Sequence, residues 1–194
     1  MIKIGVTGGI GSGKSVVCEV LRLHDIPVYD ADKEAKILND NSPIIREKLS
    51  KHFGKDLYAE GKLNKKKLTE IIFGNEGNLK IANSIIHPEL AKHFLSWVQQ
   101  QNPSPVVAID AAVLFEAGFQ KYLDYTITVT APTEIRMERV MKRDNFPKEK
   151  IEARIKSQLS DEEKIKLSDF VIINDNCRSL LAQINEIFKS ININ

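Results

Sequence analysis

The chain is 194 residues long, and at roughly 100–200 residues per domain this length predicts one domain with room for an insertion. Hydrophobic residues make up 42% of the sequence and charged residues 28%, a balance that supports a packed core and excludes a disordered chain. Lysine and arginine number 28 against 26 acidic residues, so the net charge of +2 excludes a protein held to nucleic acid mainly by bulk charge.

The cysteines and the hydropathy of the chain exclude further classes of protein. Cys18 and Cys177 are far apart in the sequence and form no disulfide or zinc-binding pattern. The N-terminus carries no basic run followed by an apolar stretch, and no apolar stretch approaches the roughly 18 residues of a membrane-spanning helix. We therefore expect a soluble, cytoplasmic protein without a membrane or nucleic-acid partner.

The chain opens with a pattern of strand, turn, helix and strand. Residues 2–6 are mainly apolar and β-branched, which predicts a buried strand that runs into the glycine-rich turn after it. Apolar residues then recur at helical spacing from Ser15 until Pro27, where a short second strand begins. Two strands joined by a helix form a βαβ unit, and such units build parallel sheets.

Residues 33–103 show helical rather than strand-like periodicity. Ser42-Pro43 predicts the start of one helix that ends at Gly54, and Asn64 is suited to cap a second helix that ends at Gly74. Residues 79–101 predict a helical pair interrupted at His87-Pro88. We expect a helical insertion of about 70 residues without strands.

Strand patterns return in the second half of the chain, at residues 106–109, 125–129 and 170–173. A charged helical stretch from Thr133 to about Leu167 separates the last two, and a final helix follows at roughly 178–190. Five apolar strands that alternate with helices predict an α/β fold with a five-stranded parallel sheet flanked by helices.

Residues 8–15 match the phosphate-loop pattern G-x-x-x-x-G-K-[ST]. Small residues let the backbone N–H groups turn toward a phosphate chain, and the helix that follows adds the positive end of its dipole. Lys14 is placed to reach the β and γ phosphates, and the Ser15 hydroxyl to bind Mg²⁺. A structural turn is the alternative, but the match lies between a strand and a helix, as the mechanism requires. The residues predicted to bind ATP here are Gly9, Gly11, Ser12, Gly13, Lys14, Ser15 and Val16.

Other sequence features select among the proteins that use such a loop. A regulatory GTPase needs D-x-x-G and N-K-x-D segments; D-x-x-G is absent, and Asn64-Lys65-Lys66-Lys67 lacks the acid that recognises guanine. A short domain with a helical insertion after the second strand favours a small-molecule kinase, in which the insertion covers the acceptor and excludes water. A nucleotide-binding regulator that hydrolyses ATP slowly is the alternative from another class.

Arginines gather in the charged helical stretch. Arg136, Arg139 and Arg143 are spaced three and four residues apart and share one helix face. Clustered arginine indicates planar, bidentate recognition of phosphate. The alternative is an exposed helix whose arginines pair with Glu134, Glu138 and Glu149.

Three carboxylates follow predicted strands. Ligands collect at the carboxyl edge of a parallel sheet, so Asp30, Asp32 and Asp110 are candidates to orient and deprotonate an acceptor hydroxyl or to bind Mg²⁺. For Asp30 we favour a helix-capping role. Asp110 closes an apolar strand as a Walker B acid does, which indicates a contact with Mg²⁺, directly or through water.

Together these residues resemble the dephospho-CoA kinase family over essentially the whole chain. The resemblance rests on an ordered set of segments: Val6 to Ser15, Asp30-Ala31-Asp32, Phe53-Gly54, Gly61 to Asn64, His87-Pro88, Leu114-Phe115-Glu116, Arg139 with Arg143, and Ser168 to Asn174. The phosphate loop alone is shared by many families, whereas this ordered set is specific.

The resemblance implies a P-loop nucleoside triphosphate hydrolase fold with a core at 1–32 and 104–194, a helical substrate-binding insertion at about 33–103 and a helical lid at about 136–167. It implies transfer of the ATP γ-phosphoryl group to the ribose 3′-hydroxyl of dephospho-CoA, the last step of coenzyme A synthesis. Separately, we expect a monomer or weak oligomer. A kinase for another nucleotide or small hydroxyl compound is the nearest alternative.

The resemblance also implies roles for individual residues. Asp32 is the expected catalytic base, with Lys14 and Arg139 as the other catalytic residues. Ser15 is expected to bind Mg²⁺, together with Asp110, whose role follows from its place at the end of a strand. Further expected contacts to ATP come from Arg139, Arg143 and Asn174, and further contacts to the acceptor come from His87, Pro88, Leu114 and Glu116.

Three positions depart from the family pattern, which usually has Pro at Ala112, Gln at Arg136 and Arg at Lys65. Arg136 either joins the cation cluster or faces solvent, so it stays outside the predicted site. His87 likewise has two interpretations. The resemblance places it near the acceptor, but a lone histidine before a proline at a helix junction is often structural.

Overall fold

The computed structural model describes residues 1–144, 151–153, 155 and 158–193. The chain folds into two compact units, Met1–Tyr29 with Gln101–Asn194 and Asp30–Gln100. The second unit begins and ends three residues before the expected insertion (30 against 33 and 100 against 103).

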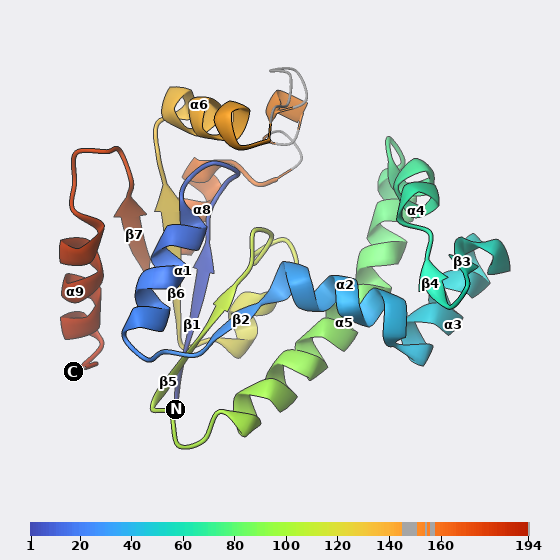
Figure 1. Cartoon of the computed structure of the whole chain (residues 1–194), viewed down its shortest axis with the longest axis horizontal. Coiled ribbons are helices and arrows are strands. Elements are labelled where there is room, and N and C mark those ends of the chain that lie inside the picture. The colour runs from blue at the N-terminus through green and yellow to red at the C-terminus, as the bar shows by residue number, and fades with distance from the viewer. Residues whose placement is uncertain (145–150, 154, 156–157, 194) are drawn as a thin grey trace. The chain divides into compact units, whose positions relative to one another are not determined.

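A five-stranded sheet forms the centre of the first unit. Its strands are β1 (Ile2–Thr7), β2 (Val28–Asp30), β5 (Val106–Asp110), β6 (Tyr125–Thr130) and β7 (Phe170–Ile173), in the order β2-β5-β1-β6-β7. β1 pairs in parallel with β5 and β6, and β6 pairs in parallel with β7. The strands point toward the edge of the sheet where α6 lies (Figure 1). The predicted five-stranded parallel sheet is confirmed.

Helices cover this sheet: α1 (Lys14–Leu23), α6 (Thr133–Asp144), α8 (Asp161–Leu167) and α9 (Leu180–Ser190), with a 3₁₀ turn at Phe119–Tyr122. Side chains of α1 and α9 share one apolar cluster with the strands, in which Cys18 is fully buried as a small hydrophobic residue. The predicted charged stretch contains α6 and α8, and residues 151–153 between them are also helical. The predicted lid at 136–167 lies partly outside the described residues.

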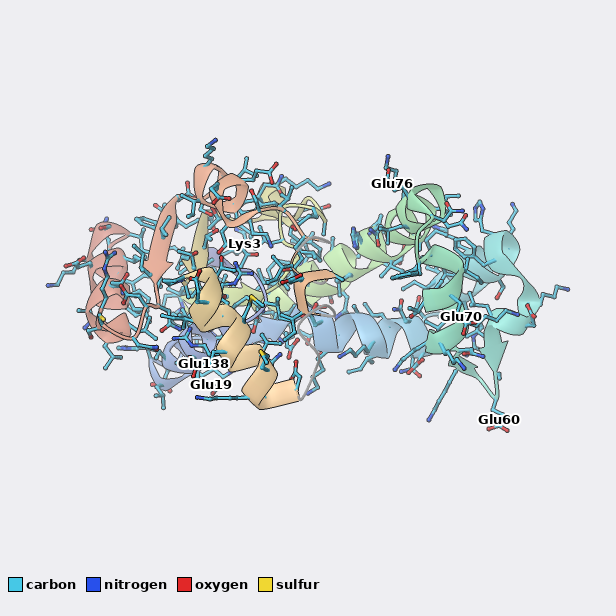
Figure 2. The ribbon with its side chains drawn as sticks, turned by 90° about the horizontal axis from the view of Figure 1, so that it is seen from above. Lys3, Glu19, Glu60, Glu70, Glu76 and Glu138 are labelled. Carbon is cyan, nitrogen blue, oxygen red and sulfur yellow. The ribbon has the colours of Figure 1, made fainter. Side chains whose placement is uncertain are left out.

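The second unit is mainly helical. It contains α2 (Ala31–Asn41), α3 (Pro43–Phe53), α4 (Lys65–Ile72) and α5 (Glu76–Gln100), with a 3₁₀ turn at Lys55–Leu57. Its own apolar core consists of Ile45, Leu49, Leu57, Leu63, Leu68, Ala82 and Ile85. The labelled side chains of Glu60 and Glu76 project outward from this unit (Figure 2), and Glu70 is likewise exposed.

The predicted helix caps of this unit are confirmed. Ser42 Oγ accepts a hydrogen bond from the Ile45 amide at 3.3 Å, and Asn64 Oδ1 accepts one from the Lys67 amide at 3.1 Å. Each side chain satisfies an amide that lacks a partner within its helix. Local capping chemistry therefore sets the starts of α3 and α4.

Two predictions for this unit are wrong. The expected break at His87-Pro88 is absent, because α5 continues through Pro88. Proline inside a helix costs about 3 kcal/mol, but apolar side chains are buried on both sides of it, at Ile85 and Phe94 among others. A hairpin of two-residue strands, β3 (Tyr58–Ala59) and β4 (Lys62–Leu63), is also present and is too short to show alternation in the sequence.

Candidate functional site

The glycine-rich loop joins the end of β1 to the start of α1. Its turn is closed by the Ser12 amide, which donates to the Gly9 carbonyl at 3.0 Å. Gly11 and Gly13 have φ values of +81° and +92°, a conformation that residues with a Cβ rarely adopt. A side chain at either position would be strained, and the motif itself specifies only the second of these two glycines, Gly13.

The N-terminus of α1 faces this loop. Gly13 occupies the N-cap, and no side chain in the described part of the chain caps the helix there. Ser15 and Val16 follow in the first turn and are exposed. The first amides of the helix and its positive dipole end are thus suited to bind a phosphate group.

Lys14 and Asp110 meet at the carboxyl edge of the sheet. The Lys14 ammonium contacts the Asp110 carboxylate, and the two side chains are only 14% and 11% exposed. Asp110 ends β5, the strand beside β1, so the sheet itself brings the predicted phosphate-binding lysine and the predicted Walker B acid together.

The donor set at this edge fits Mg²⁺. Ser15 and Asp110 supply the hydroxyl and carboxylate oxygens that this ion prefers. Within the described ranges, no group of three or more His, Cys, Asp or Glu side chains forms a metal site.

Arg139 connects α6 to the loop and to the segment after β7. Its Nη1 lies 3.4 Å from the carbonyl oxygens of both Gly11 and Ser12. Its Nη2 donates to Asn174 O at 3.1 Å and to Asn176 Oδ1 at 2.6 Å. The predicted phosphate-binding arginine therefore lies at the outer side of the phosphate loop.

Asn174 supports the loop from the same side. Its Nδ2 donates to the Ser12 carbonyl at 2.9 Å, and a Cβ on Gly13 would lie only 2.0 Å from this nitrogen. The predicted nucleotide-binding residues Arg139 and Asn174 thus share Ser12 O as an acceptor.

The other two arginines of α6 behave differently. Arg143 is exposed and forms a bidentate pair with the neighbouring Asp144, so the structure does not bring it to the loop. The hydrogen bond from Arg143 to Asp144 raises the pKa of its guanidinium. Arg136 is buried and contacts the loop at Ile10, although the sequence left its direction open. In the sequence, the position of Arg136 three residues before Arg139 was what indicated that it could face the loop.

The predicted acceptor residues Asp32, His87 and Pro88 all belong to the second unit. Asp30 caps α2 through a 2.9 Å hydrogen bond from the Lys33 amide, as predicted, and Asp32 is exposed in the first turn of that helix. His87 and Pro88 lie within α5. Burial lowers the pKa of the His87 imidazole, which favours the neutral ring.

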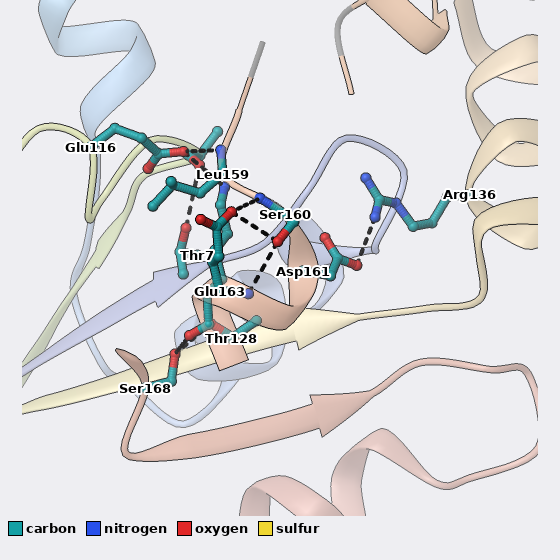
Figure 3. Close-up of polar contacts among 11 residues, drawn as sticks. Thr7, Glu116, Thr128, Arg136, Leu159, Ser160, Asp161, Glu163 and Ser168 are labelled. Atoms are coloured by element: carbon teal, nitrogen blue, oxygen red, sulfur yellow. Dashed lines mark hydrogen bonds and ion pairs between the residues drawn. The ribbon is translucent and has the colours of Figure 1, made fainter. Parts of the chain in front are cut away.

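The loop after β5 holds the other two predicted acceptor residues. Leu114 is fully buried and approaches Gly5 of β1, so its side chain supports the core and offers no surface to a substrate. Glu116 accepts a hydrogen bond from the Leu159 amide at 2.9 Å (Figure 3). It also forms an ion pair with Lys164 at 3.4 Å, so its carboxylate connects the loop after β5 to the start of the α8 segment.

Lys164 is a buried charge that sequence analysis missed. Its side chain is fully buried, and Nζ donates to the Ala112 carbonyl at 2.8 Å. Nothing in the sequence distinguishes it from the exposed lysines of the same charged stretch, because its partners lie about 50 residues away in the loop after β5.

Comparison with known proteins agrees with this geometry. The family model for dephospho-CoA kinase matches residues 2–179. The chain belongs to the dephospho-CoA kinase family. A dephospho-CoA kinase of Bacteroides fragilis is 42% identical over 186 residues, which cover 96% of this chain and 91% of that relative. One of Porphyromonas gingivalis is 42% identical over 192 residues, which cover 98% and 95%.

Solved structures support the same family and fold. A dephospho-CoA kinase from Campylobacter jejuni is 30% identical with a TM-score of 0.66, covering 98% of this chain and 95% of that chain. A Thermus thermophilus protein is 32% identical with a TM-score of 0.82, covering 98% and 96%. A shikimate kinase from Bacteroides thetaiotaomicron, 11% identical with a TM-score of 0.56, shares the fold alone, with coverage of 98% of each chain. The predictions of the family, of a kinase and of the P-loop fold are confirmed.

None of the helices that the structure describes is long and apolar enough to cross a membrane.

Proposed function

We propose that this protein transfers the γ-phosphoryl group of ATP to the ribose 3′-hydroxyl of dephospho-CoA and releases coenzyme A and ADP. The new bond joins the 3′-oxygen to the γ-phosphorus, and the bond from that phosphorus to the β–γ bridging oxygen breaks. The observation that carries the proposal is the convergence of the phosphate loop, the α1 N-terminus and the Lys14–Asp110 pair at one sheet edge, in a chain of this family.

The nucleotide occupies the phosphate loop in this proposal. The amides of Gly9 to Val16 and the ammonium of Lys14 bind its phosphates, while the loop after Asn174 lies against the adenine. Ser15 and Asp110 would hold Mg²⁺, which would neutralise part of the β- and γ-phosphate charge. Lys14 is then released from Asp110 to follow the γ-phosphoryl group.

Arginines of α6 would balance the charge that spreads over the transferred group. Arg139 already lies at the loop, 3.4 Å from the Ser12 carbonyl. Arg143 would have to exchange Asp144 for the nucleotide, and its exposure leaves it accessible for this exchange. Planar guanidinium groups suit phosphoryl oxygens because they donate two parallel hydrogen bonds. The segment at 136–167 is the proposed lid.

The acceptor is bound by the helical unit and activated by Asp32. This carboxylate is exposed in the first helical turn after β2, a strand of the sheet whose carboxyl edge carries the phosphate loop. Asp32 would accept the proton of the 3′-hydroxyl as the bond to phosphorus forms. His87, Pro88 and Glu116 are the further proposed contacts to the acceptor.

We further propose that the enzyme works in the cytoplasm as a monomer or weak oligomer, without a nucleic-acid or membrane partner. The near-neutral net charge of +2 agrees with this proposal. Sedimentation at working concentrations tests the oligomeric state, and a stable larger assembly would contradict it.

The proposed reaction is tested by ADP release from Mg-ATP with and without dephospho-CoA, using AMP, UMP and pantothenate as rival acceptors. We expect release that depends on dephospho-CoA, with coenzyme A as the product. Release with a rival acceptor would retain the nucleotide site and overturn the acceptor. A protein that binds ATP but shows no acceptor-dependent release would instead be a nucleotide-binding regulator.

A further inference from the structure

Arg136 lies on α6 with its guanidinium packed against the phosphate loop. Only 6% of its side chain is exposed. Its Nε donates to the carbonyl oxygen of Ile10 at 2.9 Å. A Cβ on Gly9 would lie 2.2 Å from Nη2 of Arg136, so the guanidinium fills the space beside that glycine. The side chain therefore contacts the turn of the loop itself.

Asp161 balances the charge of this buried guanidinium. Nη1 of Arg136 donates to Asp161 Oδ2 at 2.6 Å (Figure 3), and the same oxygen accepts from Thr130 Oγ1 at 2.8 Å. Asp161 is the first residue of α8, where the helix dipole favours a carboxylate. The pair is thus fixed by the end of β6 and the start of α8, and neither charge is buried alone.

The hydrogen bond to Ile10 has a consequence for the amide that follows it. A peptide unit is planar and trans, so the carbonyl of one residue and the N–H of the next point in opposite directions. A donor that holds the Ile10 carbonyl from outside the loop therefore directs the Gly11 N–H the other way. Phosphate loops bind their ligand through such inward-directed amides.

We propose that Arg136 is a positioning residue for the nucleotide: its Nε–H holds the Ile10 carbonyl and thereby aims the Gly11 amide at the ATP phosphates. Asp161 keeps the guanidinium in place. The inference rests on the proposed nucleotide site and adds to it a residue outside the loop motif. Arg139 stands in a similar relation to the next two carbonyls, at the longer distance of 3.4 Å.

Two variants separate the hydrogen bond from the ion pair. Glutamine places its amide nitrogen as many bonds from the backbone as arginine places Nε, so Arg136→Gln with Asp161→Asn keeps the donor and removes both charges. Lysine places a methylene at that position and its charge one atom farther out, so Arg136→Lys keeps the ion pair and removes the donor. Lys142→Gln is the control, because Lys142 is an exposed residue of α6 that pairs along the helix with Glu138.

The decisive measurement is the dissociation constant of Mg-ATP by titration calorimetry without acceptor. We expect the Gln/Asn double variant to bind within about threefold of wild type and Arg136→Lys to bind about tenfold more weakly, a loss typical of one hydrogen bond. The KM for dephospho-CoA and kcat at saturating ATP should stay near wild type in both.

A purely structural role predicts another pattern. Both variants would then lower the unfolding temperature yet bind Mg-ATP alike, and that result would overturn the proposal, as would tighter binding by Arg136→Lys. If Arg136→Lys does not fold, Arg136→Met with Asp161→Asn replaces it, since this pair lacks both donor and charge and should also bind about tenfold more weakly than the Gln/Asn variant. Because these titrations contain no acceptor, failure of wild type to phosphorylate dephospho-CoA would overturn the proposed reaction alone.

Discussion

The two units hold their functional residues by different means. In the first, three successive loop carbonyls, those of Ile10, Gly11 and Ser12, are approached from outside by Arg136, Arg139 or Asn174. In the second, Asp32 and His87 lie on helices that pack around an apolar core. The nucleotide site therefore depends on a polar network around one turn, and the proposed acceptor site depends on helix packing.

Because of this difference, we expect substitutions in the two units to affect different steps of the reaction. Changes to the polar network of the first unit should alter the handling of ATP. Changes in the second unit should alter the acceptor and the reaction while leaving ATP affinity intact.

The largest effect is expected from Lys14→Ala, which removes the only ammonium placed within the phosphate-loop motif. We expect kcat to fall about 10³-fold or more, because charge stabilisation dominates phosphoryl transfer. Steady-state kinetics at saturating substrates measures this. Lys142→Ala is the matched control, since its ammonium is exposed and pairs with Glu138. A Lys14→Ala enzyme with more than a tenth of wild-type turnover would contradict the assignment.

Asp32→Asn tests the proposed catalytic base, which lies in the second unit. Loss of a positioned general base should lower kcat about 10²- to 10⁴-fold. The Mg-ATP dissociation constant should be unchanged, because the residue is placed at the acceptor. Glu70→Gln, an exposed carboxylate of the same unit, is the control. Unchanged kcat in Asp32→Asn would remove it as the base.

Arg139→Ala breaks the links from α6 to the loop and to Asn174. We expect kcat/KM for ATP to fall about 10- to 100-fold, since charge-assisted hydrogen bonds are lost on both sides. The circular dichroism spectrum should stay as in wild type. Wild-type kinetics would instead show that the contacts of Arg139 serve the fold and not the nucleotide.

Leu49→Ala probes the packing on which the second unit depends. Leu49 is fully buried in the apolar core of that unit, and such a truncation costs about 2–5 kcal/mol. Dephospho-CoA affinity should fall while Mg-ATP affinity stays near wild type. Equal losses for both ligands would show that the two units do not act separately.

The smallest expected effect concerns pH. Burial holds the pKa of His87 below its ordinary 6.5, so the unfolded chain binds the proton more readily than the folded protein. The contribution of the neutral ring is fully present above pH 6.5 and is lost as the pH falls below it. Urea unfolding at about pH 7.5 and pH 5.5 should show a smaller acid loss of stability in His87→Gln than in wild type. Identical losses would contradict this account.

The features that could be predicted from the sequence are those that neighbouring residues along the chain determine. The phosphate loop lies in residues 8–15, the five strands are short apolar runs, and Ser42 and Asn64 cap the helices that follow them. In each case the physical cause lies within a few residues along the chain, so no knowledge of tertiary contacts was needed.

Contacts between distant residues could not be predicted in this way. Arg136 is buried because Asp161, 25 residues later, balances its charge, and Lys164 is buried because Ala112 and Glu116 accept its bonds. The continuity of α5 through Pro88 likewise depends on tertiary packing, which outweighs local propensity. These features became visible only once the folded chain brought the partners together.

The division of labour between the units is tested most directly by amide hydrogen exchange with an unreactive ATP analogue and, separately, with dephospho-CoA. The account predicts that the analogue with Mg²⁺ slows exchange at residues 9–16 and around 174, and that dephospho-CoA slows exchange within residues 30–100. Protection of the phosphate loop by both ligands, with no effect of dephospho-CoA within 30–100, would contradict it.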